Sequence, residues 1–373
     1  MKKIFLICLG LICLLNSTAL GAAVKIGLMA PLTGAYASEG ADMRRIVELL
    51  AEEVNKAGGI NGAKVEIVVQ DDGSDARTAA LAAQRLSTSG VCAVIGTYGS
   101  AVTEASQNIY HRNGIVQIAT GSTSIRLSEK GYERFFRTCP RDDEQGVVAV
   151  DTLHKMGHRQ VAILHDSTAY AVGLADEIRE GLRKGGRTNL VFYNALQPNE
   201  RDYSAVLTRL KNTNPEVIFF TGYYPEAAML RRQMRDMGWN VPMLGGDATN
   251  NTDLVKIGGA AAVEGFYFIS PPMPADLDSQ SAKDFIKSYQ DKYKTMPSSI
   301  WSVIAGDAFK VLVAAISSVG TEPEKIAVYL HKYLEDFDGL TGKISFDDKG
   351  DRVGDLYRLY RVGKQGEFVL QPR

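Results

Sequence analysis

The sequence predicts an α/β protein with two doubly wound parallel-sheet lobes. Short apolar runs alternate with segments of helical periodicity from residue 24 to residue 245, which is the pattern of repeated βαβ units. The apolar runs are continuous, as is typical of parallel strands covered by helices on both faces. The strands are too many for one comfortable sheet, and 373 residues are enough for two domains of the usual ~100–200 residues each.

The first 22 residues have the features of a signal peptide. A basic start, Met1–Lys3, precedes twelve apolar residues, Ile4–Leu15, and the small residues of Ala19–Ala22 suit a signal peptidase. A transmembrane anchor is the alternative, but twelve apolar residues are fewer than the ~20 that span a bilayer. We expect residues 1–22 to be removed and the mature chain to be released, soluble, on the far side of a membrane.

The expected elements follow from the periodicity and from the turns between runs. Apolar residues share one helical face over 43–57, and Gly58-Gly59 ends that helix. Strands are expected at 24–29, 64–70, 92–96, 115–118, 160–165, 189–194, 217–221 and 242–245. Helices are expected between them, at 75–89, 101–112, 143–156, 170–184, 203–212 and 225–237, and the pattern ends with helices over roughly 280–333 and strands at 342–346 and 355–362.

Composition narrows the class of protein. The chain has 42 Lys+Arg against 43 Asp+Glu, a net charge of −1, which is too balanced to indicate nucleic acid or an anionic membrane as partner. Two of the four cysteines remain after the predicted cleavage, Cys92 and Cys139. Export permits a disulfide between them, but both adjoin apolar stretches, and we expect buried free thiols.

The loops that follow the strands are the expected location of a binding site. In open parallel sheets, ligands bind beyond the carboxyl ends of the strands, where helix N-termini offer N–H groups to anions. These loops are rich in glycine, hydroxyl groups and tyrosine, which allow close backbone approach, donate to a carboxylate and form aromatic walls. They are residues 30–34, 96–100, 119–123, 165–170, 221–224 and 245–247.

The mature chain resembles the periplasmic solute-binding proteins of type I fold, in particular the Leu/Ile/Val-binding family that serves ABC transporters. Six segments carry the resemblance: VKIGLMAPLTGAYASEG at 24–40, NKAGGINGAKVEIVVQDDGSD at 55–75, AVIGTYGSAVTEA at 93–105, RTCPRDDEQG at 137–146, VAILHDSTAYAVGLADEI at 161–178 and FDGLTGKISFDDKGDR at 337–352.

The resemblance implies two lobes joined by three hinge crossings, with a solute held between them. The crossings are expected near Pro140, near 270–272 and near 357–358. The N-terminal lobe would then comprise residues 23–140 plus 272–357, and the C-terminal lobe 141–271 plus 358–373.

The resemblance also implies roles for particular residues. Ser100 and Thr123 match residues that bind an amino acid's α-carboxylate through hydroxyls and neighbouring backbone N–H groups, and Ser122 belongs to the same binding turn. Gly121 matches a position whose carbonyl accepts from the ammonium group. An acidic partner of that ammonium is expected at Asp247. Two tyrosines that the second lobe closes onto the ligand are expected at Tyr170 and Tyr223.

Four positions depart from the family pattern. Asp247 stands where a longer glutamate is usual, and Glu39 where a tyrosine is sometimes found. Tyr98 replaces an aliphatic residue that often lines the pocket, and Trp301 a smaller aromatic one. These residues predict a bulkier, more aromatic pocket than that of a strict leucine binder.

Each site residue also has a purely structural interpretation. Ser100 could cap the helix after it, Thr123 could be a turn hydroxyl, and Asp247 could begin a helix. Tyr170 and Tyr223 could be rim aromatics, and Trp301 could belong to the core. For the acidic pairs Asp71-Asp72 and Asp142-Asp143 we favour this structural interpretation, as strand-end solvation and hinge capping respectively.

An enzyme is the competing class. The sequence has no G-x-G-x-x-G after a strand, no phosphate-binding loop with Lys-Ser/Thr, no G-x-S-x-G elbow and no zinc-binding motif. We therefore expect no cofactor, no metal and no catalysis, although a hydrolase with dispersed catalytic residues stays open.

The sequence and the resemblance together predict an exported, monomeric, periplasmic binding protein. We expect it to capture an aliphatic or aromatic L-amino acid by hinge closure and to deliver it to the permease subunits of an ABC importer. The alternative is a related carboxylate or amide, such as an aromatic acid, urea or a short-chain amide, bound for transport or sensing.

Overall fold

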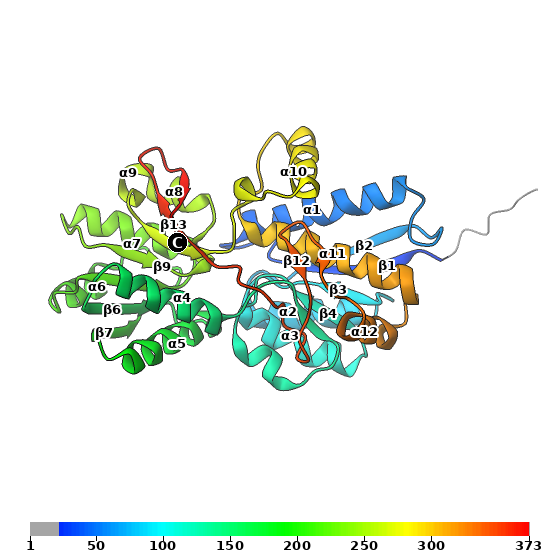
Figure 1. Ribbon diagram of the computed structural model, residues 1–373, viewed down its shortest axis with the longest axis horizontal. Coiled ribbons are helices and arrows are strands. Elements are labelled where there is room, and N and C mark those ends of the chain that lie inside the picture. Colours follow the sequence, from blue (N-terminus) through cyan, green and yellow to red (C-terminus); the bar gives the residue numbers. More distant parts are fainter. Residues whose placement is uncertain (1–21, 373) are drawn as a thin grey trace, which may run out of the picture.

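The computed structural model describes residues 22–372, and the chain forms two lobes that lie side by side along the long axis of the molecule (Figure 1). One lobe is built on a five-stranded sheet of order β2-β1-β3-β4-β5 and the other on a seven-stranded sheet of order β14-β13-β10-β9-β8-β6-β7. Helices pack against both sheets. The predicted α/β class with parallel sheets is confirmed.

The five strands of the first sheet are all parallel. They are β1 (Val24–Ala30), β2 (Val65–Asp71), β3 (Ala93–Ile95), β4 (Val116–Ala119) and β5 (Phe135–Arg137), connected by α1 (Ala37–Lys56), α2 (Ala76–Ser87), α3 (Ser100–Arg112) and a 3-10 helix, η1 (Ile125–Lys130). Side chains of β1 enter two separate apolar clusters, because successive residues of a strand point to opposite faces. Leu28 belongs to the cluster with α1, and Met29 to the cluster with α2.

The second sheet begins with parallel strands and ends with antiparallel ones. Its strands are β6 (Gln160–His165), β7 (Asn189–Ala195), β8 (Val217–Thr221), β9 (Met243–Gly245), β10 (Tyr267–Ser270), β13 (Arg358–Val362) and β14 (Phe368–Leu370). Its helices are α4 (Asp142–Lys155), α5 (Ala169–Gly185), α6 (Ser204–Lys211), α7 (Tyr224–Asp236), η2 (Asp247–Thr249), α8 (Asp253–Gly258) and α9 (Ala260–Val263).

The chain changes lobe three times. It leaves the first sheet after β5, leaves the second after β10, and returns to the second at β13 (Figure 1). The segment between β10 and β13 contains η3 (Pro274–Asp276), α10 (Gln280–Tyr293), α11 (Ile300–Val319), α12 (Pro323–Lys332), β11 (Phe337–Asp338) and β12 (Lys343–Ile344). Helix α11 packs against α1, β3 and β4 of the first lobe. It is apolar enough to cross a membrane, but 78% of it is buried inside the protein.

Several boundaries differ from the predicted ones. Helix α1 begins at Ala37, six residues before the predicted start, because its first turns bury Glu39 and Asp42, which an apolar pattern cannot reveal. Four strands were missed, β5, β10, β11 and β14, each of only two to four residues. The predicted strand at 342–346 is the two-residue β12, and the one at 355–362 begins only at Arg358.

The two remaining cysteines are buried and free, as expected. The predicted signal peptide, residues 1–22, lies almost wholly outside the described residues.

Candidate functional site

Loops from both lobes meet beyond the carboxyl ends of their strands. Tyr98, after β3, has its ring centre 5.7 Å from that of Tyr223, after β8. Tyr223 also stacks on Tyr36 of the first lobe, at 4.5 Å. The indole Nε1 of Trp301 in α11 donates to the main-chain oxygen of Asp247 at 3.4 Å. Predicted site residues from the two lobes are therefore in direct contact.

The hydroxyls of the first lobe are not equivalent. Ser100 is the first residue of α3, and its Oγ accepts from the backbone N–H of Ser124 at 3.2 Å. It does not cap its own helix, whose N-cap is Gly99. The Thr123 hydroxyl is buried and has no hydrogen-bond partner within residues 22–372. The Ser122 hydroxyl is bound inside the lobe, 2.7 Å from that of Thr103 and within reach of the Thr97 and Tyr98 carbonyls. The side chain of Ser122 is therefore not available to a ligand.

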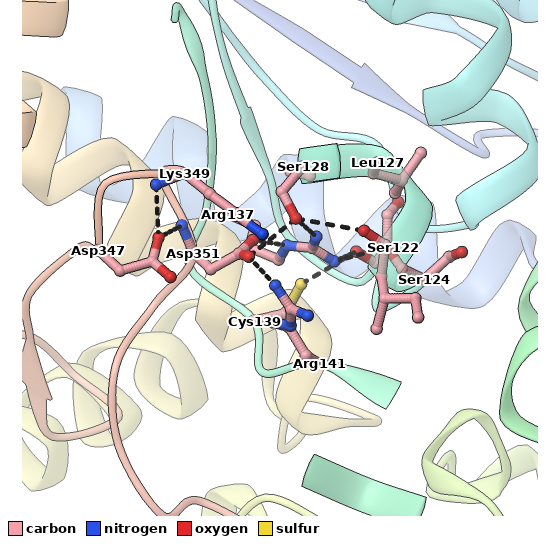
Figure 2. A network of polar contacts seen from close by, with 12 residues as sticks. Ser122, Ser124, Leu127, Ser128, Arg137, Cys139, Arg141, Asp347, Lys349 and Asp351 are labelled. Atoms are coloured by element: carbon pink, nitrogen blue, oxygen red, sulfur yellow. Dashed lines mark hydrogen bonds and ion pairs between the residues drawn. The ribbon is translucent and has the colours of Figure 1, made fainter. Parts of the chain in front are cut away.

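The buried side chain of Arg137 binds the main chain of the loop at 122–124 (Figure 2). Both bonds from Nη1 of Arg137 go to main-chain oxygens, of Ser122 at 3.0 Å and of Ser124 at 2.9 Å. Its Nε donates to Asp351 at 2.5 Å, and the second oxygen of Asp351 pairs with Arg141, at the start of α4. Arg137 is fully buried. One carboxylate thus connects the loop at 122–124 to the first crossing between the lobes.

Two buried acids lie on the side of the second lobe. Asp247 accepts from the hydroxyl of Tyr357 at 2.8 Å, and its N–H donates to Gln145 at 2.9 Å. Burial raises the pKa of its carboxyl to about 6. Asp142, the first residue of α4, is 1% exposed, and neither of its oxygens has a hydrogen-bond partner in the described part of the chain. Burial, and then the charge of Asp247, raises the pKa of Asp142 well above its usual value. The nearby Thr123 hydroxyl lowers this pKa, but the two groups do not form a hydrogen bond of normal geometry.

Asp142 was not predicted as a site residue, because the acidic pair 142–143 was interpreted as a hinge cap. The structure separates the two residues. Asp143 pairs with Arg141 at 2.8 Å and is partly exposed, whereas Asp142 is buried beside the predicted ammonium partner. The available signal was the position of the pair just after the predicted first crossing.

Tyrosines form the wall between the lobes. Tyr170 and Tyr223 are 2% and 5% exposed, so they do not lie on the rim, and their ring centres are 5.5 Å apart. Tyr36, which was not predicted, stacks between the lobes. Trp301 is 1% exposed and packs in the same apolar cluster as these tyrosines, and its indole N–H reaches the site.

Direct contacts between the lobes surround these residues. Glu39 is fully buried, and its carboxylate accepts from Ser299 at 2.6 Å and from Asn251, beyond η2 of the second lobe, at 3.0 Å. Burial raises its pKa to about 7. The Tyr224 hydroxyl reaches Ser38 at 3.2 Å. A cavity of about 430 Å³ opens beside them, with linings from both lobes that include Tyr36, Gly99, Thr168 and Tyr223.

Known proteins resemble the chain over nearly its whole length. The family model described as periplasmic binding protein matches residues 23–367. "Leu/Ile/Val-binding protein homolog 1" of Brucella abortus is 34% identical over 349 residues, 92% of each chain.

Two solved structures extend this similarity to the fold. The leucine-binding protein LivK of Thermotoga maritima has a TM-score of 0.85 at 30% identity and covers 94% of this chain and 98% of its own. LivJ of Streptococcus pneumoniae, in complex with isoleucine, has a TM-score of 0.84 at 28% identity, with 94% and 99% covered. The sequence, the two parallel sheets and the three changes of lobe agree with these comparisons, and the chain belongs to the periplasmic binding protein family, in the Leu/Ile/Val-binding group of ABC-transporter proteins.

Proposed function

We propose that this protein captures an L-amino acid between its lobes and delivers it to an ABC importer. The observation that carries the proposal is the pair of buried carboxyls, Asp142 and Asp247, in the same interlobe site as the unpaired hydroxyl of Thr123. A buried charge without a partner is costly. A zwitterion with an ammonium group at one end and a carboxylate at the other supplies both partners.

The two ends of the ligand use different groups. The carboxylate is received by the hydroxyls of Ser100 and Thr123 and by N–H groups at the start of α3, where the helix dipole favours an anion. The ammonium is received by Asp247 and Asp142, with the carbonyl of Gly121 as a third acceptor. Tyr170 and Tyr223 close over the ligand from the second lobe.

Hinge closure is the proposed mechanism. The lobes are residues 23–140 plus 272–357 and residues 141–271 plus 358–373, hinged near 140, 271 and 357. The change of sheet after β5, after β10 and before β13 supports these boundaries. A ligand shifts the equilibrium toward the closed form only by its greater affinity for that form. Contact with both lobes at once provides this difference.

The proposed location and partners follow from the family. The mature chain, after removal of residues 1–22, resides in the periplasm as a monomer, and the permease subunits of the importer recognise its closed form. It performs no chemistry on the solute. The names of the relatives support an aliphatic ligand, and the tyrosine wall also accommodates an aromatic one.

The alternative ligands lack one or both of the charged ends. An aromatic acid has no ammonium and would leave both Asp142 and Asp247 unmatched, and urea or a short amide has no full charge to offer either end of the site. We therefore favour the amino acid.

A thermal-shift screen followed by calorimetry tests the proposal. The panel contains the twenty L-amino acids, their analogues without the amino group, their amides, benzoate and urea. We expect at least one L-amino acid to raise the melting temperature by mass action and its des-amino analogue to have no effect. Tight binding of a des-amino acid or of urea, with no response to any amino acid, would refute the proposal.

A further inference from the structure

The hydroxyl of Tyr98 lacks a partner inside the protein. Tyr98 is 2% exposed, and its hydroxyl oxygen is among the buried polar atoms without a hydrogen-bond partner in residues 22–372. Buried hydroxyls nearly always have a partner, because an unpaired one is destabilising. Burial, followed by the charge of Glu39, raises the pKa of this phenol well above its usual value, so it keeps its proton and acts as a donor.

The surroundings of the ring direct this donor to the space between the lobes. The Tyr98 ring packs edge-on against Tyr36, at 5.8 Å, and against Tyr223 of the opposite lobe, at 5.7 Å. Glu39 is the nearby acceptor, but its oxygens already accept from Ser299 and Asn251. Glu39 forms no hydrogen bond with Tyr98 in this structure, so a molecule bound between the lobes can supply the missing acceptor.

Gly121 fixes the ring in place. A Cβ built on Gly121 would lie 2.7 Å from the Cδ2 atom of Tyr98 and 2.9 Å from its carbonyl oxygen, distances that real Cβ contacts do not tolerate. The backbone of Gly121 does not itself require glycine, since Gly121 is not among the residues with positive φ. The absence of a side chain at 121 therefore accommodates the Tyr98 ring, which lies against the proposed ammonium-binding turn.

We propose that Tyr98, seated on Gly121, selects ligands by donating a hydrogen bond to an acceptor in the ligand's side chain. The site then prefers an amino acid with a side-chain hydroxyl or carboxamide to a hydrocarbon of the same size. This inference rests on the proposed capture of an L-amino acid, and it replaces the aliphatic ligand that the relatives' names support by a polar one. The ligand's carboxylate has its own partners in Ser100 and Thr123, whereas Tyr98 lies among the aromatic rings that receive the side chain.

Isosteric ligand pairs test this selection. Calorimetry compares threonine with valine and asparagine with leucine, for the wild type and for Tyr98→Phe. We expect the wild type to bind the polar member of at least one pair roughly tenfold more tightly, and Tyr98→Phe to lose most of that preference, since an unmatched buried donor discriminates strongly against a ligand that lacks an acceptor. Both proteins are first shown to unfold at similar temperatures.

Each other outcome overturns the inference. If the wild type binds the hydrocarbon members as tightly or more tightly, the ligand class is wrong. If Tyr98→Phe keeps the preference, or lowers the affinity for all ligands equally, the Tyr98 hydroxyl does not bind the ligand's side chain. Gly121→Ala, whose Cβ would meet both the ring and the main chain of Tyr98, must also reduce the preference. Failure of every L-amino acid to bind would instead remove the proposed function itself.

Discussion

Replacing Asp142 by Asn separates binding from stability. The change keeps the size of the side chain and removes a charge that is 1% exposed and unpaired within the described chain. Breaking a buried ion pair costs about 3–5 kcal/mol, but the ligand's ammonium retains Asp247 as a partner. We therefore expect a smaller loss than that range, about 2–3 kcal/mol, which corresponds to roughly 30–150-fold weaker binding.

The same substitution should not destabilise the ligand-free protein. The Asp142 carboxyl has no hydrogen bond of normal geometry to lose. Asn can keep its contact with the Thr123 hydroxyl and cannot carry a buried charge, so the free energy of unfolding should stay the same or rise. Titration calorimetry measures the affinity and urea unfolding measures the stability. The matched control is Asp143→Asn, since Asp143 is partly exposed and its partner Arg141 keeps Asp351 as a second carboxylate, and it should change affinity by less than about 1 kcal/mol.

Two results would contradict this reasoning. Unchanged affinity in Asp142→Asn would remove the residue from the ammonium site. A loss of stability as large as the loss of affinity would show that its role is structural.

Three other predictions use the same site. Affinity should fall as the pH drops below about 6, because burial raises the pKa of Asp247 to about that value. The ligand's ammonium group favours the charged form of the carboxyls, so the complex holds fewer protons than the free protein. A pH series, with calorimetry in buffers of different ionisation enthalpy, measures this proton release. Ser100→Ala should weaken binding by about 1–3 kcal/mol, and a ligand whose carboxylate is replaced by an amide should be affected less. Asp351→Asn should lower the free energy of unfolding by about 3–5 kcal/mol, as measured in urea, because it leaves Arg137 buried without its counter-charge; a fully stable variant would show that the loop at 122–124 does not depend on this ion pair.

Most of the fold was predictable because its strands are continuous apolar runs in regular alternation with helices. The missed strands are short. In addition, β5 ends in the buried Arg137, and arginine is a residue type that is usually exposed. The early start of α1 was missed for the same physical reason. Glu39 is buried only because Ser299 and Asn251, more than 200 residues away in sequence, bind its carboxylate.

The candidate site was partly predictable, since the carboxyl ends of parallel strands converge on one edge. The loops carrying Ser100, Thr123 and Asp247 were identified in this way. Sequence could not tell that the Ser122 hydroxyl is bound within its own lobe. Nor could it tell which acid of the pair 142–143 is buried, because that depends on Arg141 pairing with Asp143.

The balance of charges explains why closure should require a ligand. In the proposed mechanism, contacts such as Glu39 with Asn251 favour the closed form, whereas Asp142, which is buried in this structure, has no hydrogen-bond partner in the described chain. Shifting a two-state equilibrium from 1:99 to 99:1 requires about 5.5 kcal/mol of differential affinity. An ammonium paired with buried carboxyls supplies about 3–5 kcal/mol and a hydrogen-bonded carboxylate about 1.5–3 kcal/mol. Only a ligand with both groups reaches the required sum, so a solute with a single charged end should bind one lobe without closing the other.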